Sequence, residues 1–167
     1  LGMRYIHSQK LMHRDLKPGN ILLSKHKHVR ISDFGLVKEE DITTSQTKGV
    51  GTLRFMAPEL LDEDETNGVV YTNKVDVYAF GIILIYILNE NYPPFKMSSV
   101  IKGILPSLPS TIVSWVVDLI KKCLSVSSDD RPTFDEIFSI LKSHQYDLFS
   151  ETYPSKPSAA QRKSKEE

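Results

Sequence analysis

The chain has 167 residues, the usual size of a single domain. Hydrophobic residues make up 40% and charged residues 25%, which is ordinary globular usage, so wholesale disorder and collagen-like repeats are excluded. Twenty-one basic side chains balance 21 acidic ones, and a chain without net charge is a poor candidate for general binding of nucleic acid or of an anionic membrane surface.

Cysteine usage and apolar runs bear on the cellular compartment. Cys123 is the only cysteine, so no internal disulfide can form, and a reducing, cytoplasmic environment is expected. The longest apolar run covers residues 77–88, which is 12 residues against the roughly 20 that span a bilayer, and it predicts a buried core helix. No signal peptide is visible. The first residue is Leu1 rather than Met, so we expect the chain to be a fragment or a gene model that lacks its true start.

Short elements joined by loops are predicted for the N-terminal third. Residues 1–8 carry apolar side chains at helical spacing, whereas residues 11–20 are polar without a hydrophobic pattern and predict a loop. Two β-type runs at 21–23 and 29–31 flank a polar turn and predict a hairpin. Residues 33–59 form a long polar segment, and a loop of that length in a compact domain is usually functional.

The rest of the chain is predicted to be helical, apart from its end. Helices are expected over residues 58–61, 72–88, 111–124 and 133–141. The last of these opens with Thr133-Phe-Asp-Glu136, the Thr-x-x-Glu pattern of a capping box. Residues 149–167 are rich in Ser, Pro, Lys and Glu and predict a disordered tail. The expected fold is therefore mainly α with a small β hairpin.

The histidines outside the motifs below are interpreted as ordinary. His26 and His28 flank the hairpin turn, and because no third ligand accompanies them, a solvated turn is favoured over a metal site. His7 and His144 are interpreted as ordinary helix residues. Cys123 falls on the apolar face of a helix and is expected to be inert core.

Three short motifs follow one another before residue 60. They are His-Arg-Asp-Leu-Lys-Pro-Gly-Asn at 13–20, Asp-Phe-Gly at 33–35 and Ala-Pro-Glu at 57–59. In this order and spacing they resemble the catalytic loop, the metal-binding loop and the end of the activation segment of eukaryotic protein kinases. The resemblance covers residues 1–148, and it implies that this segment is the C-terminal lobe of the kinase fold.

That resemblance implies a site for ATP and Mg²⁺. Asp15 would accept the proton of a substrate hydroxyl, and Lys17 would reach the γ-phosphate. Asp33 would offer Mg²⁺ a carboxylate and Asn20 a side-chain carbonyl, which are the oxygen ligands that this ion prefers. Leu22 would lie under the adenine ring. Phosphoryl transfer gathers negative charge on the triphosphate, so catalysis depends mainly on positioning and charge neutralisation.

Further residues resemble parts of the kinase frame. Asp76 resembles the buried helix aspartate that holds the catalytic-loop backbone, and Glu59 and Arg131 resemble the ion pair that ties the activation segment to the lower helices. Two more positions, His13 and Phe34, resemble stacked spine residues.

Substrate class follows from the same resemblance. Thr52 resembles the residue of the substrate-side loop that would bond to Asp15 and Lys17. Lys17 at its position is typical of serine/threonine kinases, so protein substrates with Ser or Thr acceptors are expected. Asp-Val-Tyr-Ala-Phe-Gly at 76–81 and Arg-Pro-Thr-Phe at 131–134 are most similar to the tyrosine-kinase-like branch of that group.

Arg14, directly before Asp15, implies regulation. Kinases with this arginine use it to hold a phosphate on the activation segment, and Lys38 could join it. A phosphate adds about −1.5 to −2 charge and can order a loop against arginine. The candidate acceptors are Thr43, Thr44, Ser45 and Thr47.

The resemblance also implies a small lobe that would lie upstream, with the Gly-rich loop and the lysine that hold the phosphates. Turnover by this chain alone is therefore expected to be very low, and an apolar surface is expected where the small lobe would sit. Two alternatives remain open. One is a pseudokinase or truncated scaffold that binds partners without catalysis; the other is a small-molecule kinase of the aminoglycoside or choline type.

Overall fold

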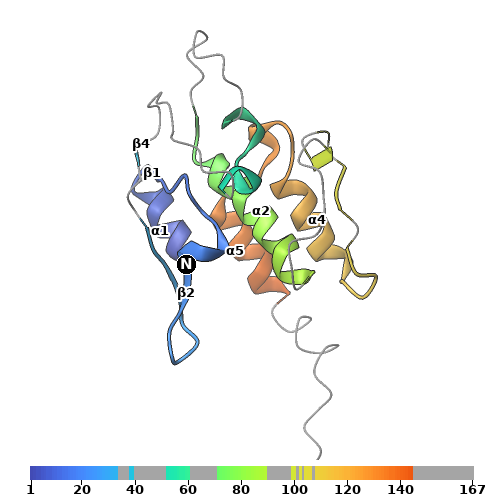
Figure 1. Ribbon diagram of the computed structural model, residues 1–167, viewed down its shortest axis with the longest axis horizontal. Helices are drawn as coiled ribbons and strands as arrows, with labels where there is room; N and C mark the ends of the chain where they lie inside the picture. The colour runs from blue at the N-terminus through green and yellow to red at the C-terminus, as the bar shows by residue number, and fades with distance from the viewer. Residues whose placement is uncertain are drawn as a thin grey trace, which may run out of the picture.

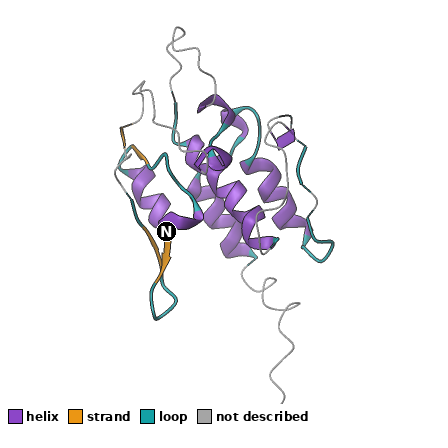
Figure 2. Ribbon diagram, viewed as in Figure 1, coloured by secondary structure: helices purple, strands orange, loops and turns teal. Residues whose placement is uncertain are grey.

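The computed structural model describes residues 1–33, 38–39, 52–60, 71–89, 99–100, 102, 104–106 and 108–144, with the backbone alone at 38, 39 and 52. The α-helices are α1 (Gly2–Ser8), α2 (Lys74–Leu88), α4 (Ser114–Cys123) and α5 (Phe134–Ser143). Figure 1 shows α2 in the middle of these helices, with α4 beside it and with α1 and the strands on the other side. Short 3-10 helices cover Pro18–Asn20, Thr52–Phe55, Pro58–Leu60 and Ser128–Asp130. Among the described residues the fold is mainly helical, as Figure 2 shows.

Helix α2 is the centre of the hydrophobic core. The sequence predicts a helix over 72–88, and the structure begins it at Lys74 because Thr72 and Asn73 form the entry turn, where their carbonyls accept from Val75 N and Asp76 N. Most of its side chains are buried, which is the behaviour of a helix that is apolar all round. This confirms that the longest apolar run is a buried core helix.

Close contact between α2 and α4 depends on a glycine. A Cβ at Gly81 would lie 2.9 Å from Cys123 Cβ and 2.9 Å from a Leu124 methyl group, so only glycine lets the two helices approach this closely. Cys123 is fully buried, and burial raises the pKa of its thiol to about 12. The thiol therefore stays protonated at neutral pH, in agreement with an inert core position.

Strands form two small antiparallel pairs. β2 (Ile21–Leu23) pairs with β3 (Val29–Ile31), which confirms the predicted hairpin, and Leu22 lies opposite Arg30. β1 (Leu11–Met12) pairs with β4 (Lys38–Glu39), which the sequence did not predict, since both segments were expected to be loops. A two-residue strand is too short to show an alternating pattern, so only pairing across the chain reveals it.

Large apolar side chains are exposed on α1 and on the β2–β3 hairpin. They are Leu1, Tyr5, Leu22, Leu23 and Val29, with exposed fractions from 51% to 84%. The apolar surface expected where a small lobe would sit stays a prediction. Within the same described part of the chain, no helix combines the length and the apolar character that crossing a bilayer requires.

Helix α5 begins with the capping box that the sequence predicts. The Glu136 backbone N–H donates to Thr133 Oγ1 at 3.2 Å, and the Thr133 backbone N–H donates to Glu136 Oε2 at 2.7 Å. These bonds satisfy two amide groups that would otherwise lack partners at the helix start. The hydrogen bond from the Thr133 backbone, followed by that from its hydroxyl, lowers the pKa of Glu136 below its usual 4.5.

Replacing Glu136 by Gln is expected to remove a pH-dependent part of the stability. Because the folded chain binds this proton less tightly than the unfolded chain does, the stabilisation is complete above about pH 4.5 and is lost as pH falls through the lowered folded pKa. Urea unfolding of the parent and of Glu136→Gln should therefore differ most near pH 6 and converge as pH falls below the lowered folded pKa. A difference that stays constant across this range would contradict the assignment. Thr133→Ala should cost about 1 kcal/mol at neutral pH.

Candidate active site

One buried carboxylate, that of Asp76, accepts hydrogen bonds from the backbone of the loop after β1. Asp76, in the first turn of α2, accepts the backbone N–H of His13 at Oδ2 and that of Arg14 at Oδ1, both at 2.8 Å. Asp76 is 1% exposed. Arg14 has a left-handed backbone with φ of 66°, which is costly for a residue with a Cβ and persists only where the surroundings impose it. The Asp76 bonds thus fix the turn that presents Asp15.

Asp15 has one carboxylate oxygen with hydrogen-bond partners and one without. Lys17 Nζ lies 2.6 Å from Asp15 Oδ2, and the Asn20 side-chain nitrogen donates to the same oxygen at 3.1 Å and to the Asp15 carbonyl at 2.8 Å. Asp15 Oδ1 is buried and makes no hydrogen bond with the described residues. A buried acceptor without a partner is uncommon, and a catalytic role is one of the reasons for which such a group is retained.

The hairpin brings Asp33 to the same loop. Ser32 N donates to the Asn20 carbonyl at 2.9 Å, and a His13 ring nitrogen lies 3.0 Å from the Ser32 carbonyl oxygen. Asp33 follows directly, with an exposed side chain and a left-handed φ of 65°. Ser32 is therefore in contact with both His13 and Asn20, which brings three separate parts of the chain together next to Asp33. Phe34, with the glycine after it, lies outside the described residues.

Leu22 of β2 is 51% exposed, and its neighbour Leu23 is 71% exposed. In the hairpin Leu22 lies opposite Arg30. Its predicted place under an adenine ring remains a prediction.

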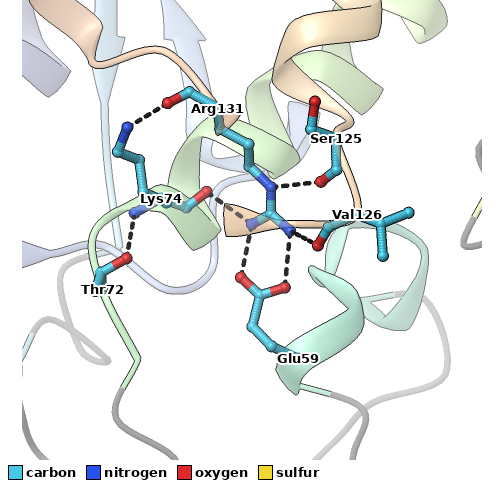
Figure 3. Close-up of polar contacts among 6 residues, drawn as sticks. All are labelled: Glu59, Thr72, Lys74, Ser125, Val126 and Arg131. Carbon is cyan, nitrogen blue, oxygen red and sulfur yellow. Dashed lines mark hydrogen bonds and ion pairs between the residues drawn. The ribbon is translucent and has the colours of Figure 1, made fainter. Parts of the chain in front are cut away.

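Arg131 and Glu59 form an ion pair that joins two distant segments, shown in Figure 3. Arg131 Nη1 and Nη2 donate to the two Glu59 oxygens at 2.6 and 2.9 Å. The remaining donors of Arg131 reach backbone carbonyls of Lys74, Ser125 and Val126. All five guanidinium N–H groups thus have an acceptor, on a side chain that is completely buried.

The aromatic ring beside this pair is part of the same buried group. The Arg131 guanidinium lies 5.1 Å from the Tyr78 ring centroid. Burial raises the pKa of Tyr78 to about 12, with Arg131 opposing and Glu59 adding to the shift. Tyr78 therefore stays protonated and leaves the charge of Arg131 to be balanced by Glu59.

Residues 52–60 lie against the loop and α2. Thr52 begins the helix Thr52–Phe55, and its side chain is outside the described residues. A cavity of about 10 Å³, room for roughly one water molecule, is lined by residues of this segment together with Asp15 and Asp76. The Ala-Pro-Glu motif leads into the helix Pro58–Leu60, from which Glu59 reaches Arg131.

The predicted regulatory residues are only partly described. Arg14 is 5% exposed, and burial lowers the pKa of its guanidinium, against the opposing effects of Tyr71 and Asp76. The four candidate acceptors, Thr43, Thr44, Ser45 and Thr47, lie outside the described residues, and Lys38 is described only as backbone in β4.

The two histidines interpreted as ordinary helix residues lie in α1 and at the C-cap of α5, and both make specific contacts. His7 Nε2 lies 2.8 Å from Asp76 Oδ2, and the His144 ring stacks on Trp115 with centroids 4.6 Å apart. These pairs are far apart in the sequence, so no local pattern signals them. His26 and His28 are exposed with ring centroids 6.4 Å apart, and the described residues contain no cluster of three His, Cys, Asp or Glu side chains suited to a metal.

Comparison with known proteins adds an independent observation. Residues 1–146 match the family model described as "Protein kinase domain". A probable serine/threonine-protein kinase of Dictyostelium discoideum is 41% identical over 145 residues, which are 84% of this chain and 14% of that protein. The RGS domain-containing serine/threonine-protein kinase A of the same organism is 39% identical, over 87% of this chain and 13% of that protein.

A plant protein gives a similar match. The serine/threonine/tyrosine-protein kinase HT1 of Arabidopsis thaliana is 36% identical over 151 residues, which cover 86% of this chain and 37% of that protein. The chain therefore spans well under half the length of these relatives.

Proposed function

This chain belongs to the protein kinase family, and from that premise we propose that residues 1–148 form the C-terminal lobe of an ATP-dependent serine/threonine kinase, followed by a tail at 149–167. The observation that carries the proposal is the Asp15 carboxylate, which has one oxygen bound by Lys17 and Asn20 and the other buried without a hydrogen-bond partner. Two of the relatives named above are serine/threonine-protein kinases by name and the third is a serine/threonine/tyrosine-protein kinase, which supports Ser and Thr acceptors. Membership of a tyrosine-kinase-like branch, from the motifs at 76–81 and 131–134, is part of the same proposal.

Asp15 orients the substrate hydroxyl in this proposal. Its oxygen without a partner accepts the hydroxyl proton, and because Lys17 and Asn20 hold the other oxygen, the acceptor has a fixed direction. Base assistance of this kind contributes about 10²–10⁴ in rate. The Lys17 ammonium lies 2.6 Å from Asp15 Oδ2. In this proposal it neutralises charge on the transferred phosphoryl group.

Asn20 and Asp33 are the residues that would hold a divalent cation, and their chemistry fits Mg²⁺. The Asn20 nitrogen is used by Asp15, which leaves its carbonyl oxygen as a ligand, and the Asp33 carboxylate is exposed. Mg²⁺ commonly takes only one or two carboxylates from protein and completes its shell with phosphate oxygens and water. A cation held there would supply positive charge that neutralises the phosphate groups. The exposed Leu22 offers an apolar surface for the adenine ring.

Other predicted residues support this site without touching substrate. The ion pair of Glu59 and Arg131 joins the segment that carries the Ala-Pro-Glu motif to the segment between α4 and α5. His13 bonds to the Ser32 carbonyl and so ties the loop to the residue before Asp33. Phe34 and Thr52 keep their predicted roles as a spine residue and as a substrate-side residue.

Regulation through Arg14 is proposed with the acceptor residues 43–47. Phosphorylation of Thr43, Thr44, Ser45 or Thr47 is expected to raise turnover, because a phosphate of about −2 charge can pair with arginine and order the segment. A variant with all four replaced by alanine should lack the increase that phosphorylation gives to the parent. Equal turnover of the variant and of the phosphorylated parent would refute the proposal.

Transfer of labelled phosphate distinguishes the candidate functions. The chain, joined to a small lobe from its own gene, should label a generic protein on Ser and Thr when supplied with γ-labelled ATP and Mg²⁺, and it should not label an aminoglycoside or choline. Transfer to the small molecules instead would support the small-molecule kinase. Partner binding with no transfer to any acceptor would support the scaffold. Phosphoamino acid analysis settles the Ser/Thr assignment.

A further inference from the structure

The helix Thr52–Phe55 brings an arginine close to the Asp15 carboxylate. Phe55 and Met56 are both buried, and they line the same small cavity as Asp15. Arg54 directly precedes Phe55 in the chain. Because consecutive Cα atoms are about 3.8 Å apart, the Arg54 side chain begins within one residue of the wall of that cavity.

The side chain of Arg54 is directed away from the core. Leu53 is half-buried and Phe55 is buried, whereas Arg54 is exposed. A 3-10 helix has about three residues per turn, so the side chains of neighbouring residues point about 120° apart, and burial of Phe55 turns Arg54 outward. The guanidinium keeps its positive charge throughout the usual pH range. A permanent positive charge therefore lies at the surface beside the place at which a substrate hydroxyl would meet Asp15.

Two charged side chains near Arg54 already have partners within the fold. Lys17 Nζ lies 2.6 Å from Asp15 Oδ2. Glu59, the acidic residue of the same segment, accepts hydrogen bonds from Arg131 with both of its carboxylate oxygens. The exposed charge of this segment is therefore that of Arg54, and it is positive.

We infer that Arg54 selects substrates that carry Asp or Glu close to the Ser or Thr acceptor; this inference rests on the proposed kinase function. An extended peptide advances about 3.3–3.6 Å per residue, so side chains within about three residues of the acceptor come within reach of Arg54. The planar guanidinium can bind a carboxylate through two parallel hydrogen bonds. A carboxylate beside the triphosphate would otherwise be repelled by it, and Arg54 offsets that repulsion.

Peptides that differ in one side chain test this selection. Each peptide contains a single Ser, and Glu, Gln or Lys is placed at one of the three positions on either side of it. In the chain joined to a small lobe, kcat/KM for the best Glu peptide should exceed that for its Gln counterpart about tenfold, the effect of a charge-assisted hydrogen bond. Arg54→Met should abolish this ratio, and Arg54→Glu should make the Lys peptide the better substrate.

The matched control is Arg4→Met, the same substitution at an arginine of α1 whose side chain is 35% exposed. It should leave the Glu-to-Gln ratio at the value of the parent. The ratio is taken within each variant, so a general loss of stability or turnover does not change it. A Glu preference that survives in Arg54→Met would overturn the inference, as would an equal loss of this preference in Arg4→Met.

The parent alone decides the question where Arg54→Met does not fold. Its Glu preference should weaken as NaCl is raised from about 0.05 to 0.5 M, because salt screens an exposed ion pair. A parent that does not distinguish Glu from Gln peptides at low salt would overturn the inference.

A binding measurement separates failure of this inference from failure of the kinase function. Absence of phosphate transfer by the parent would count against the kinase function. Fluorescence polarisation of labelled peptides with the 167-residue chain then reports on Arg54 without catalysis. Tighter binding of the Glu peptide than of the Gln peptide by the parent, lost in Arg54→Met, would support the role of Arg54, and equal binding of the two peptides would overturn it.

Discussion

Arg131→Met should lower the free energy of unfolding by about 3–5 kcal/mol, which is a large loss for a single substitution. The reason is the charge left behind: Arg131 Nη1 and Nη2 lie 2.6 and 2.9 Å from Glu59, whose carboxylate would lose both donors. Three backbone carbonyls would lose their donor as well. Urea unfolding at neutral pH measures the change.

A matched control is available at the surface. Arg4 pairs with Asp135 at 2.5 Å, but its side chain is 35% exposed and that of its partner 71%, so solvent screens the attraction. Arg4→Met should therefore cost about 1 kcal/mol or less. Equal effects of the two Arg→Met substitutions would show that burial and full hydrogen bonding do not set the strength of the Arg131–Glu59 pair.

Asp15→Asn should reduce phosphoryl transfer about 10²–10⁴-fold in the chain joined to a small lobe, while ATP binding persists. An amide at this place cannot take the hydroxyl proton, yet it occupies the same volume beside Lys17 and Asn20. Asp118→Asn, on the exposed face of α4, is the matched control and should leave transfer unchanged. If Asp15→Asn retains turnover within a factor of about two, Asp15 is not the base.

Asp33→Asn tests the second carboxylate by a different readout. Removal of its charge should weaken ATP binding in the presence of Mg²⁺ to the level seen without the cation, because the metal loses its protein carboxylate. Calorimetric titration of ATP with and without Mg²⁺ measures this dependence. Metal-dependent binding that survives in Asp33→Asn would remove Asp33 from the proposed cation site.

Features set by neighbouring residues were predictable from the sequence. The hairpin, the buried helix α2 and the capping box of α5 follow from patterns within a few residues of each other, because periodicity and capping act over one or two turns. The catalytic-loop motif is equally local, and its residues were named through their resemblance to the protein kinase family. Pairing of β1 with β4 was missed because two residues cannot show a period.

Contacts between distant segments needed the folded chain. His7 and Asp76 are 69 residues apart, and Arg131 and Glu59 are 72 apart. The second pair was anticipated only through resemblance to a family, and the first was not anticipated at all. The sequence alone determined which residue types are available and which helices and turns carry them. Only the tertiary structure decided which buried charges share a partner, because desolvation makes each buried donor and acceptor depend on a group brought close by packing.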